Sequence, residues 1–222
     1  MTWLTTFLNS SIGKKFVMAI TGLLMCGFLI IHLAGNLTLF GGADIFNNYV
    51  KTLTAFKPFV RVIEVVLLFI FGSHIISGVR LLLENKKATA VKYKYNQAEK
   101  NSSISSRTMA ISGTILLIFL ITHLSTVWYN FQLEHDDGRF FAIITGADIG
   151  LGNILVALLY GVTMVILGFH LRHGFQSAFQ TFGVRYNRYG KLIEIVSVLF
   201  WFIIPAGFLS IVIYFGFMGG GN

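Results

Sequence analysis

Five long apolar runs constrain the fold of this chain more than any other feature. Each run holds about 22–25 residues and, as a helix, measures about 33–37 Å, which is enough to cross the hydrocarbon core of a bilayer. Only 12% of the residues are charged, about half the share that a soluble domain carries, and 55% are hydrophobic. The sequence therefore predicts an all-α, multi-pass membrane protein. The expected spans are residues 16–40, 60–83, 108–130, 151–173 and 192–216.

Residues 1–222 are expected to form a single membrane domain. The segment 1–15 precedes the first span and carries Trp3 and Phe7, which predicts a short interfacial helix. A cleaved signal peptide is not expected, because the apolar run that follows is too long. Pro205 lies within the last expected span and predicts a kink there. We expect no internal repeat.

Lysines and arginines are distributed unevenly between the two ends of the expected spans. If the N-terminus is inside, 13 of the 17 basic residues fall on the inner side. The positive-inside rule then predicts a cytoplasmic N-terminus and, after five spans, an outer C-terminus in the cell inner (cytoplasmic) membrane. The net charge of +8 thus indicates orientation in the membrane rather than binding of nucleic acid. The basic inner loop 84–107 suits a soluble partner or anionic lipid.

Four of the six histidines fall one to each of the first four spans: His32, His74, His123 and His170. An ionisable residue inside a span is costly and indicates function, although a lone histidine is as often hydrogen-bonded to a neighbouring helix. At about 1.5 Å per residue, His32 and His123 lie roughly 25 and 24 Å from the inner edge. His74 and His170 lie roughly 21 and 28 Å from the outer edge. The four residues therefore form an outer pair and an inner pair, about 12–16 Å apart along the membrane normal.

Two pairs of imidazoles at two depths are the ligand set that two haems b require, because each haem iron accepts one imidazole on each face. A zinc or copper cluster would instead need three or four ligands at one depth, often including cysteine or carboxylate. Glycines flank two of the histidines in GSHIISG (72–78) and GFHLRHG (168–174). They leave room for a porphyrin, although glycines also serve ordinary helix packing.

Two cationic side chains lie just beyond the ligand of the fourth span. We assign His170 as the haem ligand, and Arg172 and His173 as candidate partners of the haem propionates, because carboxylates need such donors. An interfacial anchoring role accounts for Arg172 and His173 equally well.

The segments SSIGKKFVMAITGLLM, HLAGNL and HLRHGFQSAFQTFG resemble the dihaem cytochrome b membrane subunit of succinate:quinone oxidoreductases (succinate dehydrogenase / fumarate reductase). The resemblance implies that His74 and His170 ligate the inner, proximal haem, and His32 and His123 the outer, distal haem. It also implies an iron–sulfur partner subunit, bound to an FAD flavoprotein that carries out the dicarboxylate chemistry of the tricarboxylic acid cycle. This chain itself has neither a dinucleotide fingerprint nor a cysteine set for an iron–sulfur cluster, so no catalytic residues are expected in it.

The resemblance further implies electron exchange with a membrane quinone, commonly menaquinone, near the outer haem. A quinone carbonyl needs hydrogen-bond donors and protons. Loop solvation or helix capping is the simpler account of each candidate taken alone. Some dihaem relatives carry a glutamate two residues before the fourth-span ligand, linked to transmembrane proton movement, but this chain has Gly168 there. The outer polar candidates for the quinone site are Asn36, Asp44, Asn47, Lys51 and Glu64.

Two other interpretations stay open on the sequence alone. One is a dihaem cytochrome b that serves a different membrane dehydrogenase, of the hydrogenase or nitrate reductase type. The other is a transporter or purely structural membrane protein, without haem, whose buried histidines are hydrogen-bonded to neighbouring helices.

Overall fold

The computed structural model describes residues 2–88, 107–134, 138–184 and 188–220, and within these residues all of the regular secondary structure is helical. Five helices are long and apolar enough to cross a membrane, so the predicted all-α class and the five predicted spans are confirmed. Each observed span extends past the predicted bounds at one end or both, since the helices continue beyond the apolar runs. The spans are Ser11–Gly41, Lys57–Lys87, Met109–Leu133, Ile154–Thr181 and Gly190–Phe217.

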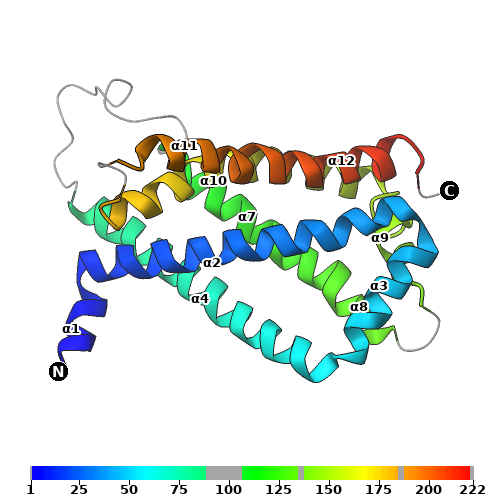
Figure 1. The fold of residues 1–222 in the computed structure, drawn as a ribbon, viewed down its shortest axis with the longest axis horizontal. Helices are drawn as coiled ribbons and strands as arrows, with labels where there is room; N and C mark the ends of the chain where they lie inside the picture. Colours follow the sequence, from blue (N-terminus) through cyan, green and yellow to red (C-terminus); the bar gives the residue numbers. More distant parts are fainter. Residues whose placement is uncertain (1, 89–106, 135–137, 185–187, 221–222) are drawn as a thin grey trace.

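The long helices form a bundle, and most of the short helices gather at one end of it (Figure 1). The bundle helices are α2 (Ser11–Leu37), α4 (Lys57–Ala88), α7 (Met109–His123), α10 (Ile154–Thr181), α11 (Gly190–Val198) and α12 (Ile204–Phe217). The short elements are α1 (Trp3–Asn9), the 3₁₀ turn η1 (Thr38–Gly41), α3 (Ala43–Ala55), the π-helical turn η2 (Leu124–Trp128), α8 (Tyr129–Leu133), α9 (Phe140–Thr145) and the π-helical turn η3 (Leu199–Ile203).

The expected interfacial segment 1–15 is divided between two helices. Only α1 stands apart, and the first spanning helix already begins at Ser11. Ser10 caps that helix, because its hydroxyl oxygen accepts a hydrogen bond from the Gly13 backbone N–H at 3.0 Å. Lys14 and Lys15 therefore belong to the first turns of α2 rather than to an interfacial helix.

The helices share two ends, which we call the α1 end and the α3 end. Helix α1, the starts of α2, α7 and α11, and the ends of α4 and α10 lie at the α1 end, whereas α3, α8, α9 and the end of α12 lie at the α3 end (Figure 1). Helix α2 packs closely on α4, and α10 packs on α2, α7 and α12. Helix α10 is thus central to the bundle.

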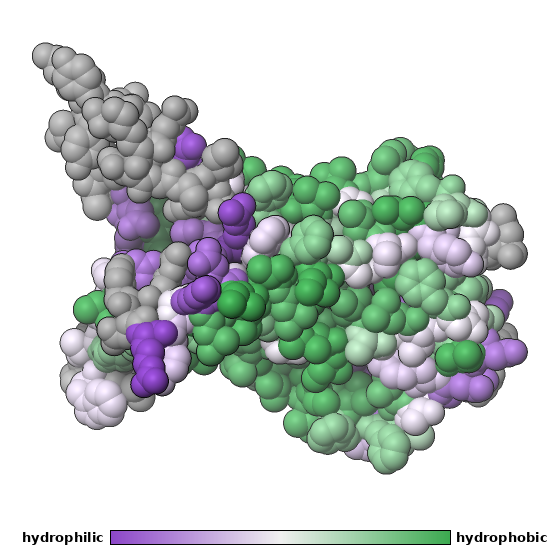
Figure 2. Space-filling model, turned by 45° about the horizontal axis from the view of Figure 1, so that its top comes forward, coloured by the Kyte–Doolittle hydropathy of each residue, from purple (hydrophilic) through white to green (hydrophobic). Residues whose placement is uncertain are grey.

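The surface of the bundle is suited to lipid rather than water. Apolar side chains cover its middle, and hydrophilic side chains gather toward its ends (Figure 2). Leu68 and Phe69 on α4 are each 70% exposed, and Leu155 on α10 is 73% exposed. An apolar belt of this kind is stable when hydrocarbon replaces water around it.

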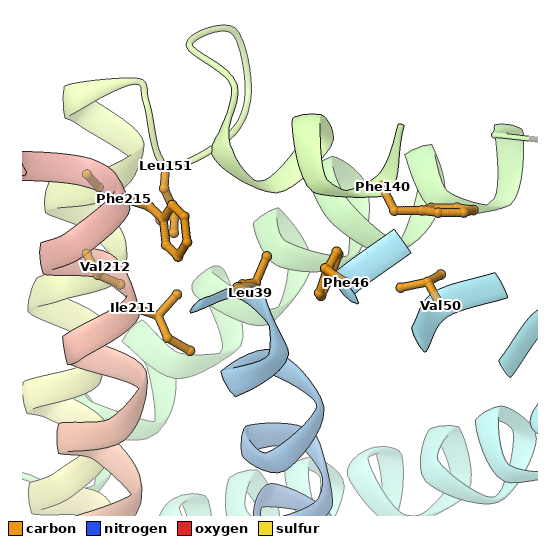
Figure 3. Close-up of a cluster of buried hydrophobic side chains, with 9 residues drawn as sticks. Leu39, Phe46, Val50, Phe140, Leu151, Ile211, Val212 and Phe215 are labelled. Atoms are coloured by element: carbon orange, nitrogen blue, oxygen red, sulfur yellow. The ribbon is translucent and has the colours of Figure 1, made fainter. Parts of the chain in front are cut away.

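An apolar cluster closes the bundle at the α3 end (Figure 3). After η1 the chain turns back, so that α3 and α9 lie over the end of α12 and bury their large side chains together. The labelled side chains of this cluster are Leu39, Phe46, Val50, Phe140, Leu151, Ile211, Val212 and Phe215.

The last spanning helix departs from α-helical geometry at η3, directly before Pro205, as the proline predicts. Proline has no N–H to donate, and its ring opposes the carbonyl four residues earlier, which belongs to Trp201. Helix α10 lies very close to the last spanning helix at this point. A Cβ atom added at Gly168 would lie 2.8 Å from the Trp201 carbonyl oxygen. Any side chain at position 168, a glutamate included, would push the two helices apart.

Candidate functional site

A cavity of about 2300 Å³ extends through the bundle from the α1 end to the α3 end. Its walls come mainly from α2, α4, α7 and α10, and most of the lining side chains are apolar. Typical small-molecule pockets measure about 300–1,000 Å³, so this cavity has room for more than one large ligand. All four histidines predicted as ligands line it.

His32 of α2 and His123 at the end of α7 meet in the half of the cavity nearer the α3 end. Their ring centroids are 5.9 Å apart, and the ring planes are inclined at 84°. Phe28 stacks on the His32 ring at 5.1 Å, and Phe119 stacks on the His123 ring at 5.7 Å. Each stacking partner lies one helical turn before its histidine, so the helix itself holds the imidazole in place.

His74 of α4 and His170 of α10 lie in the half of the cavity nearer the α1 end. The two imidazoles are close enough to interact electrostatically. Nδ1 of His74 lies 3.1 Å from Thr21 Oγ1 on α2, and Nδ1 of His170 lies 3.1 Å from Ser112 Oγ on α7. The helices α2 and α7 therefore contribute a hydroxyl to this pair.

A third hydroxyl serves the other pair, because Nδ1 of His123 lies 3.1 Å from the Tyr160 hydroxyl on α10. Sequence reasoning missed Thr21, Ser112 and Tyr160. The sequence signal for them was weak, because each is only a hydroxyl residue within an apolar span. The direction in which its side chain points depends on how the helices pack.

The spacing of the paired histidines suits two axial ligands of one haem iron. Two imidazole nitrogens bound to one metal from opposite sides, at about 2 Å each, place the ring centroids about 6 Å apart. The separation of His32 and His123 is 5.9 Å. Among the described residues, no three histidine, cysteine, aspartate or glutamate side chains gather around one point. The paired imidazoles therefore suit a metal whose remaining ligands come from a macrocycle.

Glycines provide close approach to the imidazoles of the pair nearer the α1 end. A Cβ atom at Gly22 of α2 would lie 3.3 Å from Cε1 of His74, and one at Gly113 of α7 would lie 3.7 Å from Cε1 of His170. Each of these glycines directly follows the residue whose hydroxyl contacts the same imidazole.

The structure separates the two cationic candidates of α10. His173 lines the cavity, as do Lys15 and Arg107, which sequence reasoning did not single out. Arg172 is not among the cavity-lining residues, because its guanidinium lies over the Trp201 ring, 5.1 Å from the ring centroid.

Glu64 anchors a polar network where the cavity meets the α3 end. Its carboxylate accepts one hydrogen bond from Arg61 at 2.6 Å and another from the indole N–H of Trp128 at 2.8 Å. Arg61 also donates to Gln132. Glu64, Arg61 and Trp128 line the cavity. The network joins α4 to η2 and α8 and brings one predicted quinone residue to the cavity wall.

Of the other predicted quinone residues, one lines the cavity and three lie on the short helix α3. Asn36 lines the cavity, whereas Asp44, Asn47 and Lys51 lie on α3 and are not among the lining residues. The side-chain oxygen of Asn47 accepts a hydrogen bond from the Phe141 backbone N–H at 2.9 Å, which ties α3 to α9.

Tyr49 is a cavity residue on α3 that sequence reasoning missed. Burial raises the pKa of its hydroxyl above the ordinary value of 10.0. The hydroxyl is therefore protonated at neutral pH and is a hydrogen-bond donor at this end of the cavity.

One part of the chain matches a known protein family. Residues 16–102 match the family described as succinate dehydrogenase/fumarate reductase transmembrane subunit. The matched region contains His32 and His74 and the first two spans, so the resemblance seen in the sequence is confirmed there. No curated protein and no solved structure matches the chain.

Proposed function

Because residues 16–102 carry the sequence pattern of the succinate dehydrogenase/fumarate reductase transmembrane subunits, we propose that this chain is the membrane anchor and electron-transfer subunit of a succinate:quinone oxidoreductase. The observation that carries the proposal is the pair of imidazoles, His32 and His123, whose ring centroids lie 5.9 Å apart in a largely apolar cavity. A second histidine pair lines the same cavity toward the α1 end.

In this proposal His74 and His170 hold the inner haem b, and His32 and His123 hold the outer one. Bound haem would supply one-electron carriers at two depths of the membrane. The chain binds and orients these groups through its imidazoles, and Phe28 stacks on one of those rings. The apolar cavity walls exclude water from the carriers.

The α1 end faces the cytoplasm in this proposal and holds an iron–sulfur subunit, itself bound to an FAD flavoprotein that interconverts succinate and fumarate. Basic side chains support this orientation, since Lys14, Lys15, Lys86 and Lys87 belong to helix ends at the α1 end and Arg107 lies just before α7. The same cations suit anionic lipid of the inner membrane. Most of the basic loop 84–107, including residues 89–106, lies outside the described residues.

The quinone, with menaquinone as the expected type, would bind where the cavity meets the α3 end. Interconversion of quinone and quinol transfers two electrons and two protons, so the site needs a group that exchanges protons. Glu64 is the carboxylate in the cavity wall there, held by Arg61 and Trp128. Asn36 and Tyr49 line the same region and could donate hydrogen bonds to a quinone carbonyl.

The proposal is tested on the complex purified from membranes with this chain tagged. A reduced-minus-oxidised visible spectrum should show the α-band of haem b, and haem analysis should give two haems per chain. A flavoprotein and an iron–sulfur protein should co-purify. A nickel or molybdenum subunit in their place would assign the chain to another dehydrogenase, and a spectrum without haem would contradict both haem proposals.

A further inference from the structure

Two hydroxyl side chains approach Nδ1 atoms of the cavity histidines nearer the α1 end, and each donates its own proton to a backbone carbonyl. We propose that Thr21 and Ser112 are positioning residues: each accepts a hydrogen bond from the Nδ1–H of an inner-haem ligand and so reserves Nε2 as the coordinating nitrogen. This inference rests on the proposed function, because it concerns histidines assigned there as haem ligands.

The direction of the Thr21 hydrogen bond follows from proton counting. A hydroxyl has one proton to donate, and Thr21 Oγ1 donates it to the Val17 carbonyl at 2.7 Å. Toward Nδ1 of His74, 3.1 Å away, the oxygen can only accept. Nδ1 therefore carries the proton of the neutral imidazole, and Nε2 keeps its lone pair.

Ser112 repeats this arrangement on α7. Its hydroxyl donates to the Met109 carbonyl at 3.1 Å, and its oxygen lies 3.1 Å from Nδ1 of His170. The same count assigns the proton to Nδ1 and the lone pair to Nε2 of His170.

Tyr160 is not part of this proposal. Its hydroxyl also lies 3.1 Å from a cavity imidazole, at Nδ1 of His123, but that hydrogen bond can run in either direction.

A recurring spacing in the sequence supports the role of both hydroxyls. The hydroxyl–glycine dipeptides Thr21-Gly22 and Ser112-Gly113 each begin eleven positions before a cavity histidine of their own helix, His32 and His123. In each dipeptide the hydroxyl contacts an imidazole from the next spanning helix, and the glycine lets that ring approach. Two independent helices thus build the same support for the inner ligand pair.

The physical consequence concerns the strength and orientation of the ligand. An acceptor on Nδ1–H fixes the tautomer and the ring orientation and makes Nε2 a more basic donor. A more basic ligand favours the ferric form of a haem. Loss of such a partner typically weakens metal binding about 10–100-fold.

The inference is tested in the purified complex with Thr21→Val and Ser112→Ala. Each variant should make the midpoint potential of the inner haem more positive, shift its low-spin ferric EPR signal, and leave the outer haem unchanged. Thr21→Ser should restore the wild-type values.

Thr163→Val is the matched control, because Thr163 is fully buried and its hydroxyl donates to the Leu159 carbonyl at 2.7 Å. Unshifted potentials and EPR signals in variants that retain both haems would overturn the inference and leave the proposed function intact. Equal haem loss in Thr21→Val and Thr163→Val would also overturn it, since general destabilisation would then explain both. Absence of haem from the wild-type complex would instead contradict the proposed function.

Discussion

The cavity histidines are held by ring stacking and by hydroxyl groups. His32 lies between Phe28 and Phe208, with ring centroids at 5.1 and 5.7 Å. His123 packs on Phe119 and also meets Tyr160. Neutral partners of this kind keep an imidazole oriented in an apolar environment without burying a second charge.

Ligand substitutions should separate the two haems. We expect His32→Ala or His123→Ala to remove the outer haem and spare the inner one, and His74→Ala or His170→Ala to do the reverse, because each removes one axial imidazole. Haem content per chain and the α-band spectrum of the purified complex measure this. His173→Ala tests the alternative ligand on α10 and should retain both haems; loss of a haem there, with His170→Ala harmless, would reverse our choice of ligand.

Gly168 is a packing position rather than part of a proton path. We expect Gly168→Ala to lower the free energy of unfolding by about 1–3 kcal/mol, because its Cβ would crowd backbone atoms of the last spanning helix. Gly27→Ala on α2 is the control, since nothing lies within 4 Å of its added Cβ. Thermal unfolding in detergent compares the two variants, and equal stability would show that the close contact carries no strain.

At the scale of elements, two π-helical turns interrupt the spanning helices. One lies beside a cavity histidine, and the other lies just before the proline of the last span. One, η2, directly follows His123 and ends at Trp128, which binds Glu64. The other, η3, precedes Pro205. Single π-helical turns inside α-helices often occur at functional sites, and η2 links a haem-ligand candidate to the Glu64 network within one helix.

Helices α2 and α4 are joined at the α1 end by an ion pair between Lys14 and Glu84. The Lys14 side chain is only 12% exposed, so the pair is better shielded than a surface ion pair. We expect a double-mutant cycle of Lys14→Met and Glu84→Gln to give a coupling energy of about 1 kcal/mol in unfolding. Lys15→Met should be additive with Glu84→Gln, and coupling of equal size for both lysines would argue against a specific pair.

For the whole molecule, an odd number of spans places the described chain ends at opposite ends of the bundle (Figure 1). The lysines and arginines gather at the α1 end, which sets the proposed orientation.

Cysteine labelling of intact cells tests this orientation. A membrane-impermeant maleimide should label Thr52→Cys, which is exposed on α3, and should not label Lys87→Cys, at the end of α4, until the membrane is opened. The wild-type chain is the control, since its single cysteine, Cys26, is buried in the bundle. Labelling of Lys87→Cys alone in intact cells would invert the proposed topology.

Hydropathy and helix geometry allow much of this molecule to be predicted. The five spans follow from runs of apolar residues, which is a local property, and the depth of each histidine follows from the constant rise of a helix. Pro205 likewise marks an irregular turn on its own. The common depth of His32 and His123 could be predicted for the same reason.

The amino-acid order does not determine how each helix is rotated about its axis or which side chains of neighbouring helices it meets. Arg172 lies over Trp201 rather than in the cavity wall, and Asn47 ties α3 to α9, because their directions depend on how neighbouring helices pack. The partnership of Thr21 with His74 joins positions far apart in sequence. The sequence by itself therefore determined the spans and the depths of the imidazoles, since those depend on single helices, whereas only the tertiary structure decided which side chain meets each imidazole.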